Sequence, residues 1–187
     1  MSTGEDVARF TSLYRQHYSK VLSYSLAHDQ CNVAEDITNE TFLTVWLKLD
    51  EVPEDDPVPW LFGIARRHRL KQRDSGRRAI SIADRIRQFG DERDHRSRDT
   101  ADLVAERDAG LAAFASLSER DAEILILTAW YGLTPAQAAR VLGCSSATFF
   151  VRLHRARKRL TQALKADKPS PRPVPSGIQT ESLEGQH

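Results

Sequence analysis

The sequence predicts an all-α protein made of two small helical domains that a flexible linker joins. Apolar residues recur at intervals of three and four along most of the chain, and no strand-like alternation persists. A charged segment with few large apolar residues separates two such blocks, and a length of 187 residues suits two small domains.

The same patterns predict the boundaries of the domains. We expect the first domain over residues 8–78, the linker over 79–102 and the second domain over 103–165. Prolines then stand at every second position from Pro169 to Pro175, and the rest of the tail has almost no apolar content. Residues 166–187 are therefore expected to be disordered, as either an inert solvated end or a partner-binding segment.

Three helices are predicted in the first domain. Apolar and aromatic residues in the range 10–22 share one face of the first helix. Asn32, with Glu35 three residues later, is typical of the N-terminal cap of the second helix. Three prolines in the range 52–59 predict a loop, and the apolar pattern of the third helix begins at Trp60.

Cap residues mark the helices of the second domain. Ser118 is a cap residue before an apolar helix that ends at Gly132. The run Thr134-Pro135-Ala136-Gln137 supplies an N-cap, a proline at the first helical position and a glutamine at the third. The helix that follows is expected to stop at Gly143.

A short helix, a turn at Gly143-Cys144-Ser145 and a long basic helix form the pattern of a helix-turn-helix. Either Ser145 or Ser146 caps the long helix, which runs over 147–164. Small Ala138 and Ala139 permit close helix approach, and a glycine permits the sharp turn. The second helix can then enter the major groove of DNA. The alternative is an antiparallel helical hairpin in an unrelated bundle.

The formal net charge of +1 hides a strong segregation of charge along the chain. Residues 29–56 hold nine acids and one base, whereas residues 60–78 and 146–168 each hold seven bases and one acid. Two concentrated basic stretches favour two contacts with a polyanion such as nucleic acid, over ordinary solvated helix faces.

Other classes of protein have little support. No apolar run approaches the about 18 residues that span a bilayer, and the first residues lack the features of a signal peptide. Cys31 and Cys144 are too few for a disulfide scaffold or a metal knuckle, and no phosphate loop or metalloprotease motif is present. We expect a cytoplasmic protein with no catalytic residue, metal or cofactor.

Three stretches of the sequence carry a resemblance to a known family. Residues 111–160, with Leu117-Ser118-Glu119-Arg120-Asp121 and the run 152–160, resemble the fourth conserved region of bacterial sigma factors of the extracytoplasmic-function type. Residues 34–46 are similar to region 2.2 of that family, and 60–67 resemble the start of its promoter-melting helix. The resemblance implies a transcription initiation factor that binds core RNA polymerase.

By this resemblance, region 2.2 contacts the polymerase. The residues that it assigns to polymerase binding are Asp36, Asn39, Glu40 and Phe42. Acidic and polar side chains at helical steps suit a basic partner surface. Phe42 and Trp46 have an alternative role as core residues, which we favour for Trp46.

The resemblance also assigns the two basic stretches to the two promoter elements. The residues implied for the unpaired −10 strand are Trp60, Arg66, Arg67, Arg69, Lys71 and Arg73. Those implied for the −35 duplex are Ser145, Ser146, Thr148, Phe150, Val151, Arg152, Arg155, Lys158 and Arg159. For Trp60, a core position is the favoured alternative to stacking on DNA.

Three departures from the family pattern bear on partners and specificity. Asn39 stands where the family often has glutamine, and Arg67 where it usually has asparagine. Phe150 and Val151 stand where the recognition helix often carries a basic and a small residue, so we expect an unusual −35 preference.

The resemblance further implies an anti-sigma factor as regulator, with sequestration at the membrane as one mode, and no stable membrane insertion of the chain itself. The competing classes are an enzyme, for which the sequence offers little, and a stand-alone repressor or activator.

Overall fold

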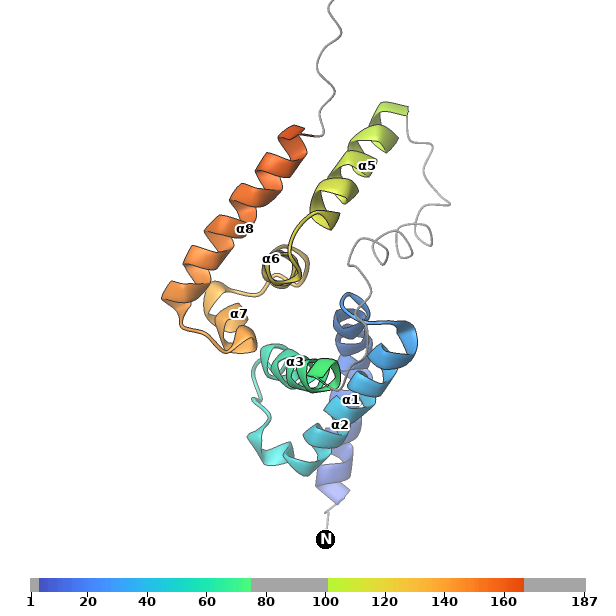
Figure 1. Ribbon diagram of the computed structural model, residues 1–187. Coiled ribbons are helices and arrows are strands. Elements are labelled where there is room, and N and C mark those ends of the chain that lie inside the picture. The colour runs from blue at the N-terminus through green and yellow to red at the C-terminus, as the bar shows by residue number, and fades with distance from the viewer. Residues whose placement is uncertain (1–3, 75–100, 167–187) are drawn as a thin grey trace, which may run out of the picture.

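A computed structural model of the protein describes residues 4–74 and 101–166 (Figure 1). Within these ranges every regular element is a helix, which confirms the predicted all-α class. The predicted linker lies outside the described residues except for 101 and 102, and the predicted tail except for 166.

Three α-helices build the first domain. α1 (Gly4–Leu26), α2 (Cys31–Leu47) and α3 (Val58–Asp74) pack against one another, and a short 3-10 helix, η1 (Leu49–Glu51), follows α2. Their apolar faces meet, because burial removes those faces from water. The buried apolar and aromatic side chains include Val21, Tyr24, Ile37, Phe42, Val45, Leu61 and Phe62.

Two helix starts in this domain differ from the prediction. The predicted cap Asn32 lies inside α2, whose N-cap position is Gln30. α3 begins at Val58, two residues before the predicted start, and Pro59 lies in its first turn. A proline is tolerated there because the first N–H groups of a helix have no partner within it.

The second domain holds the predicted helix-turn-helix. α5 (Ala101–Ala115) is followed by α6 (Glu119–Leu125), which continues as a π-helical turn, η2 (Ile126–Trp130). α7 (Pro135–Leu142) and α8 (Ser146–Ala166) then form the two helices of the motif. α5 and α6 both pack against α8, so they fix the long helix on the domain.

The predicted caps of this domain are confirmed. The Ser118 hydroxyl accepts a hydrogen bond from the Asp121 N–H at 3.3 Å. Thr134 and Gln137 form a reciprocal capping box at the start of α7. Gly143 ends α7 with φ at 65°, in the left-handed region that a glycine enters without steric cost.

The two domains lie against each other (Figure 1). α3 packs against α7, and the Tyr131 ring lies beside the rings of Tyr24 and Phe62, with centroid distances of 6.2 and 4.8 Å. The Tyr131 hydroxyl donates to Ser23 Oγ at 3.1 Å. The sequence predicted domains able to sit apart, whereas the described residues form a direct contact between them.

Candidate nucleic-acid and polymerase interfaces

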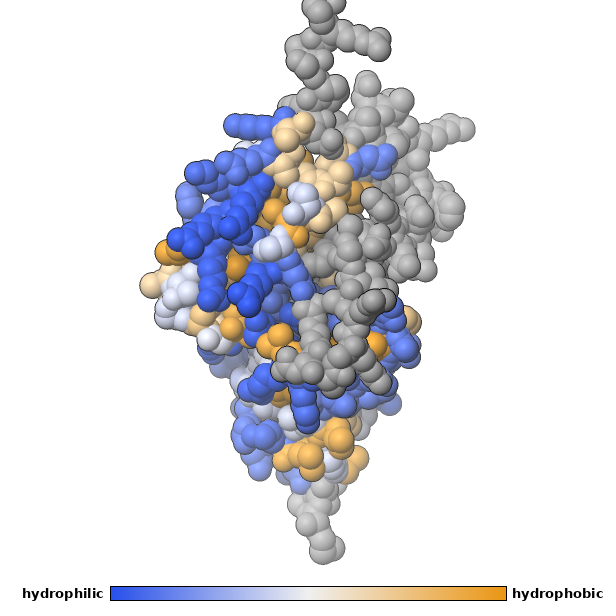
Figure 2. Space-filling view, in the orientation of Figure 1, coloured by the Kyte–Doolittle hydropathy of each residue, from blue (hydrophilic) through white to orange (hydrophobic). Residues whose placement is uncertain are grey.

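α8 presents the predicted −35 residues on a continuous outer face. Phe149, Leu153 and Ala156 recur at steps of four and three and are buried against the domain. The opposite face is therefore free to meet a partner, and Figure 2 shows hydrophilic side chains gathered along this helix. The exposed predicted residues are Ser145, Ser146, Thr148, Phe150, Val151, Arg152, Arg155, Lys158 and Arg159.

The start of α8 is held by a local cap. The Ser145 hydroxyl accepts a hydrogen bond from the Thr148 N–H at 3.2 Å, and the two side-chain oxygens lie 2.9 Å apart. Of the two predicted caps, Ser145 is thus the one that the structure uses. The cap fixes where the exposed residues of the first turns begin.

Arg159 has a partner within its own domain. Its guanidinium donates to the buried carboxylate of Asp121 in α6, which also accepts from the Ser118 hydroxyl at 2.7 Å. The pair ties α8 to α6 and leaves the Arg159 side chain largely exposed. Arg155 and Arg152 lie about one and about two turns closer to the N-terminus of the helix.

Two apolar side chains interrupt the polar face of α8. Phe150 is 56% exposed and Val151 is 51% exposed, next to the buried Phe149. These two side chains offer apolar contact area on an otherwise cationic face. On DNA, the matching group in the major groove is the methyl of thymine.

The predicted −10 cations of α3 fall on two different faces. Arg67 and Lys71 are exposed and lie four residues apart, on one side of the helix. Arg66 and Arg69 lie on the side that meets the second domain, and Arg69 is only 2% exposed. Arg73 lies in α3, but its side chain is outside the described residues.

Trp60 is half-buried and packs against the core of the first domain. The core interpretation of this residue therefore has support, and its stacking on DNA stays a prediction. The loop before α3 contacts the second domain: Gln137 of α7 donates a hydrogen bond to the carboxylate of Asp56.

α2 exposes the polar side chains that were predicted to bind polymerase. Asp36, Asn39 and Glu40 are exposed, on steps of three and four. Phe42 is instead buried, with its ring 4.9 Å from that of Tyr14, so it supports this face from beneath in the described arrangement. The Trp46 ring packs on Phe10 at 5.1 Å, in agreement with a packing role.

Sequence reasoning missed two residues of this face. Leu43 is 59% exposed and Leu47 is 74% exposed, and they continue the row from Asn39 at steps of four. The sequence pattern could have identified them, because these leucines do not lie on the helix face that contains the buried Phe42 and Val45. A polar face with two exposed leucines has the composition of a protein-binding surface.

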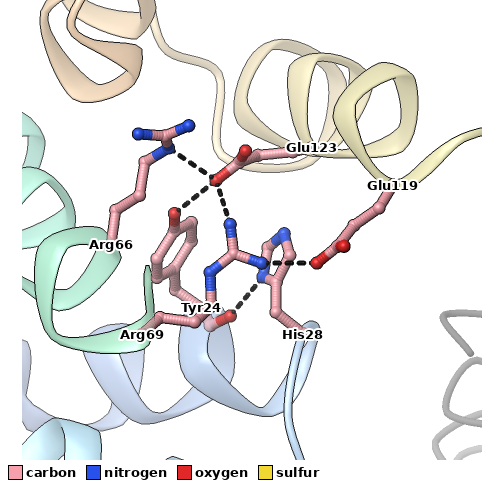
Figure 3. A network of polar contacts seen from close by, with 6 residues as sticks. All are labelled: Tyr24, His28, Arg66, Arg69, Glu119 and Glu123. Carbon is pink, nitrogen blue, oxygen red and sulfur yellow. Dashed lines mark hydrogen bonds and ion pairs between the residues drawn. The ribbon is translucent and has the colours of Figure 1, made fainter. Parts of the chain in front are cut away.

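A network of charged and polar groups joins α1 and α3 to α6 (Figure 3). Arg69 donates to Glu119 Oε1 and to Glu123 Oε1, each at 2.7 Å. Arg66 Nε donates to the same Glu123 oxygen at 3.1 Å, and the Tyr24 hydroxyl donates to it at 2.9 Å. Glu123, only 3% exposed, thus gathers three donors from the first domain.

Charges in this network change the pKa of its members. Burial acts to raise the pKa of Glu123, but the positive charges of Arg69 and Arg66 and the hydrogen bond from Tyr24 outweigh it, and the pKa lies below its ordinary value. Burial lowers the pKa of His28 to about 4, and the positive charge of Arg69 contributes. Its Nδ1 lies 2.8 Å from the Tyr24 carbonyl oxygen. At neutral pH the network therefore contains an ionised Glu123 and an uncharged His28.

No group of three or more His, Cys, Asp and Glu side chains among the described residues is placed to hold a metal ion. Among the described helices, none combines the length and the apolar character that crossing a membrane requires.

Comparison with known proteins finds two matching family models. The model described as sigma-70 region 2 matches residues 13–79, and the model described as sigma-70, region 4, matches residues 109–160. The search of the curated proteins finds no match.

Solved structures share the fold. One is the co-crystal structure of the sigma factor RpoE with the anti-sigma factor NepR from Bartonella quintana, at 24% identity over 85% of this chain and 98% of that chain, with a TM-score of 0.58. Another is the structure of CnrH in complex with the cytosolic domain of CnrY, at 26% identity over 84% of this chain and 88% of that chain, with a TM-score of 0.54.

Proposed function

The chain belongs to the sigma-70 family, of the extracytoplasmic-function type, and on this premise we propose that it binds core RNA polymerase, directs it to promoters and helps to melt them. The observation that carries the proposal is the exposed cationic face of α8 in the domain that matches region 4. We take 8–78 and 103–165 as the extents of the two functional domains.

The proposed −35 contact uses α8 as the recognition helix. The capped first turns would present Ser146, Phe150 and Val151 to base edges, while Arg152 and Arg155 grip phosphates. Lys158 and Arg159, which is paired with Asp121, would contact further phosphates of the DNA backbone. Burial of Phe149 against the domain supports this orientation, since it turns the opposite face outward.

The proposed −10 contact uses α3. Arg67 and Lys71 supply exposed cations, and Arg66, Arg69 and Arg73 complete a cationic helix that suits an unpaired strand. Arg66 and Arg69 are engaged with α6 in the described arrangement, so they reach DNA only after the domains separate.

The proposed polymerase contact uses the outer face of α2. Asp36, Asn39 and Glu40 would meet a basic surface, and the exposed Leu43 and Leu47 would supply the apolar contact area. The His68 ring restrains this face, with Nδ1 2.9 Å from Glu40 Oε2 and Nε2 3.0 Å from Thr44 Oγ1.

We also propose that an anti-sigma factor regulates the protein in the cytoplasm. The support is the likeness to CnrH, which was solved with the cytosolic domain of CnrY. The matched sigma-70 region models are consistent with a regulator of transcription rather than a catalyst.

Association with core RNA polymerase tests the proposal against a stand-alone regulator. We expect the chain to comigrate with core enzyme in gel filtration at low ionic strength. Leu43→Ser with Leu47→Ser should weaken comigration, whereas Leu164→Ser, which changes an exposed leucine on α8, should not. A chain that binds duplex DNA but never core enzyme would overturn the proposal and favour an ordinary repressor or activator.

A further inference from the structure

Two arginines of the DNA-binding helix are held by carboxylates of the other domain. Arg69 bridges Glu119 and Glu123 of α6 at 2.7 Å each, and Arg66 joins Glu123 at 3.1 Å. Figure 3 shows both guanidinium groups pointing from α3 toward α6. Glu119 and Glu123 lie four residues apart, so one face of α6 presents both carboxylates.

The carboxylates occupy the guanidinium groups in the way that phosphates would. A guanidinium binds carboxylate and phosphate oxygens through the same planar set of donors. While Arg66 and Arg69 are bound to α6, they cannot also bind the backbone of a DNA strand. Arg67 and Lys71 lie on the outer side of α3 and stay available.

The contact combines charged and aromatic groups. Its ion pairs lie beside the rings of Tyr24, Phe62 and Tyr131, and interfaces between domains of one chain resemble transient ones. Separation would leave Arg69 and Glu123 without partners unless each finds a replacement. Water can solvate the carboxylate, and a DNA strand can supply phosphates to the arginine.

We propose that Arg66 and Arg69 of α3 with Glu119 and Glu123 of α6 form an intramolecular latch, in which region 4 carboxylates occupy the region 2 cations until promoter DNA displaces them. The inference rests on the proposed function of α3 in DNA binding. Arg67 and Lys71 make the first contact with the strand, and the strand then replaces α6 on Arg66 and Arg69. The closed form thereby lowers the affinity of the free protein for DNA.

A distance measurement on the full chain tests the latch. Spin labels on Cys31 and on Gln162→Cys, in a Cys144→Ser background, lie in different domains at exposed positions. We expect a narrow distance distribution for the parent protein and a broad, longer component in Glu123→Gln. Unchanged distance distributions in both Glu123→Gln and Glu119→Gln would overturn the latch.

Two further variants control for folding and for charge. Glu119→Gln also removes a bond to Arg69, but the Glu119 side chain is 33% exposed, so it keeps the test valid if Glu123→Gln fails to fold. Asp108→Asn removes the same charge from an exposed position on α5, away from the contact, and should leave the distances unchanged.

Addition of DNA separates failure of the latch from failure of the proposed function. A mixed-sequence single-stranded oligonucleotide should lengthen the distance in the parent protein and bind the Glu→Gln variants about three to ten times more tightly, since the closed form no longer competes. Opened variants without any DNA binding would contradict the function of α3 and leave the latch standing. DNA binding with constant distances would overturn the latch alone.

Discussion

At the scale of single residues, we propose that the exposed side chains of α8 divide into phosphate ligands and groups that can read bases. Arg152 and Arg155 are exposed cations, whereas Phe150 and Val151 are exposed apolar side chains on the same helix. Phosphate ligands add affinity without sequence preference, and contacts to base edges add preference. Their substitution should therefore have different consequences for DNA binding.

Arg155→Ala should weaken binding to −35 duplex DNA of any sequence. Loss of one phosphate contact makes the slope of log affinity against log salt concentration shallower by about 0.9. Titrations at several salt concentrations measure the slope. Arg120→Ala removes an exposed arginine from α6 and should leave the slope unchanged; equal effects of the two variants would contradict the assignment of α8.

Phe150 should discriminate thymine from uracil in the −35 element. Uracil lacks the methyl group, and loss of one buried methyl is worth about 0.8 kcal/mol, or about fourfold in affinity. Replacement of the contacted thymine by deoxyuridine should therefore lower the DNA affinity of the parent protein by about that factor. Phe150→Ala should be insensitive to the same replacement, and an undiminished sensitivity would refute the contact.

His28 should make the protein less stable in acid. Its pKa of about 4 in the folded protein lies below the 6.5 of the unfolded chain, so the unfolded chain binds more protons between these values. The free energy of unfolding should fall by about 1.4 kcal/mol per pH unit as the pH drops from 6.5 toward 5. Below that window Glu123, whose pKa is also lowered, adds a loss in the same direction.

Urea unfolding at several pH values checks this slope. His28→Asn keeps an N–H that can meet the Tyr24 carbonyl oxygen but removes the titrating ring. The slope between pH 6.5 and 5 should then become shallow. The same substitution at the exposed His154 is the control, and an equal flattening there would contradict a role for His28.

At the scale of elements, the turn between α7 and α8 sets the orientation of the recognition helix. Gly143 has a φ of 65°, and the space around a Cβ added there is open. A side chain at position 143 would therefore destabilise the protein only through the backbone conformation that it must adopt. Gly63 also has open space around an added Cβ, but it lies within α3.

These two glycines should respond to alanine with opposite signs. Gly143→Ala should destabilise the protein by about 1–2 kcal/mol, because the left-handed conformation is unfavourable for a residue with a Cβ. Gly63→Ala should stabilise it by up to about 1 kcal/mol through helix propensity. Thermal unfolding measures both, and a neutral Gly143→Ala would contradict the left-handed turn.

The elements show which features local sequence can predict. The capping box at Thr134 and the end of α7 at Gly143 both follow from contacts within a few residues, and both were predicted correctly. Asn32 failed as a cap because its sequence pattern fits more than one helix start. The buried pairs of Arg69 could not be predicted, since Glu119 and Glu123 lie 50 and 54 residues away in the sequence.

At the scale of the whole molecule, the closed contact between the domains and the proposed promoter contacts exclude each other on α3. The outer faces of α2 and α8 remain available in the closed form, whereas the inner face of α3 is occupied. Polymerase binding and −35 binding can therefore precede the release of Arg66 and Arg69. Opening of the two domains would then accompany capture of the −10 strand.

Run-off transcription with purified core RNA polymerase tests the central claim most directly. Templates are taken from start sites mapped after overexpression of the chain. The account predicts a transcript of defined length only when core enzyme and chain are both present, and its loss when Arg67→Ala and Lys71→Ala are combined. Correct binding of the same templates with no transcript under any condition would contradict it.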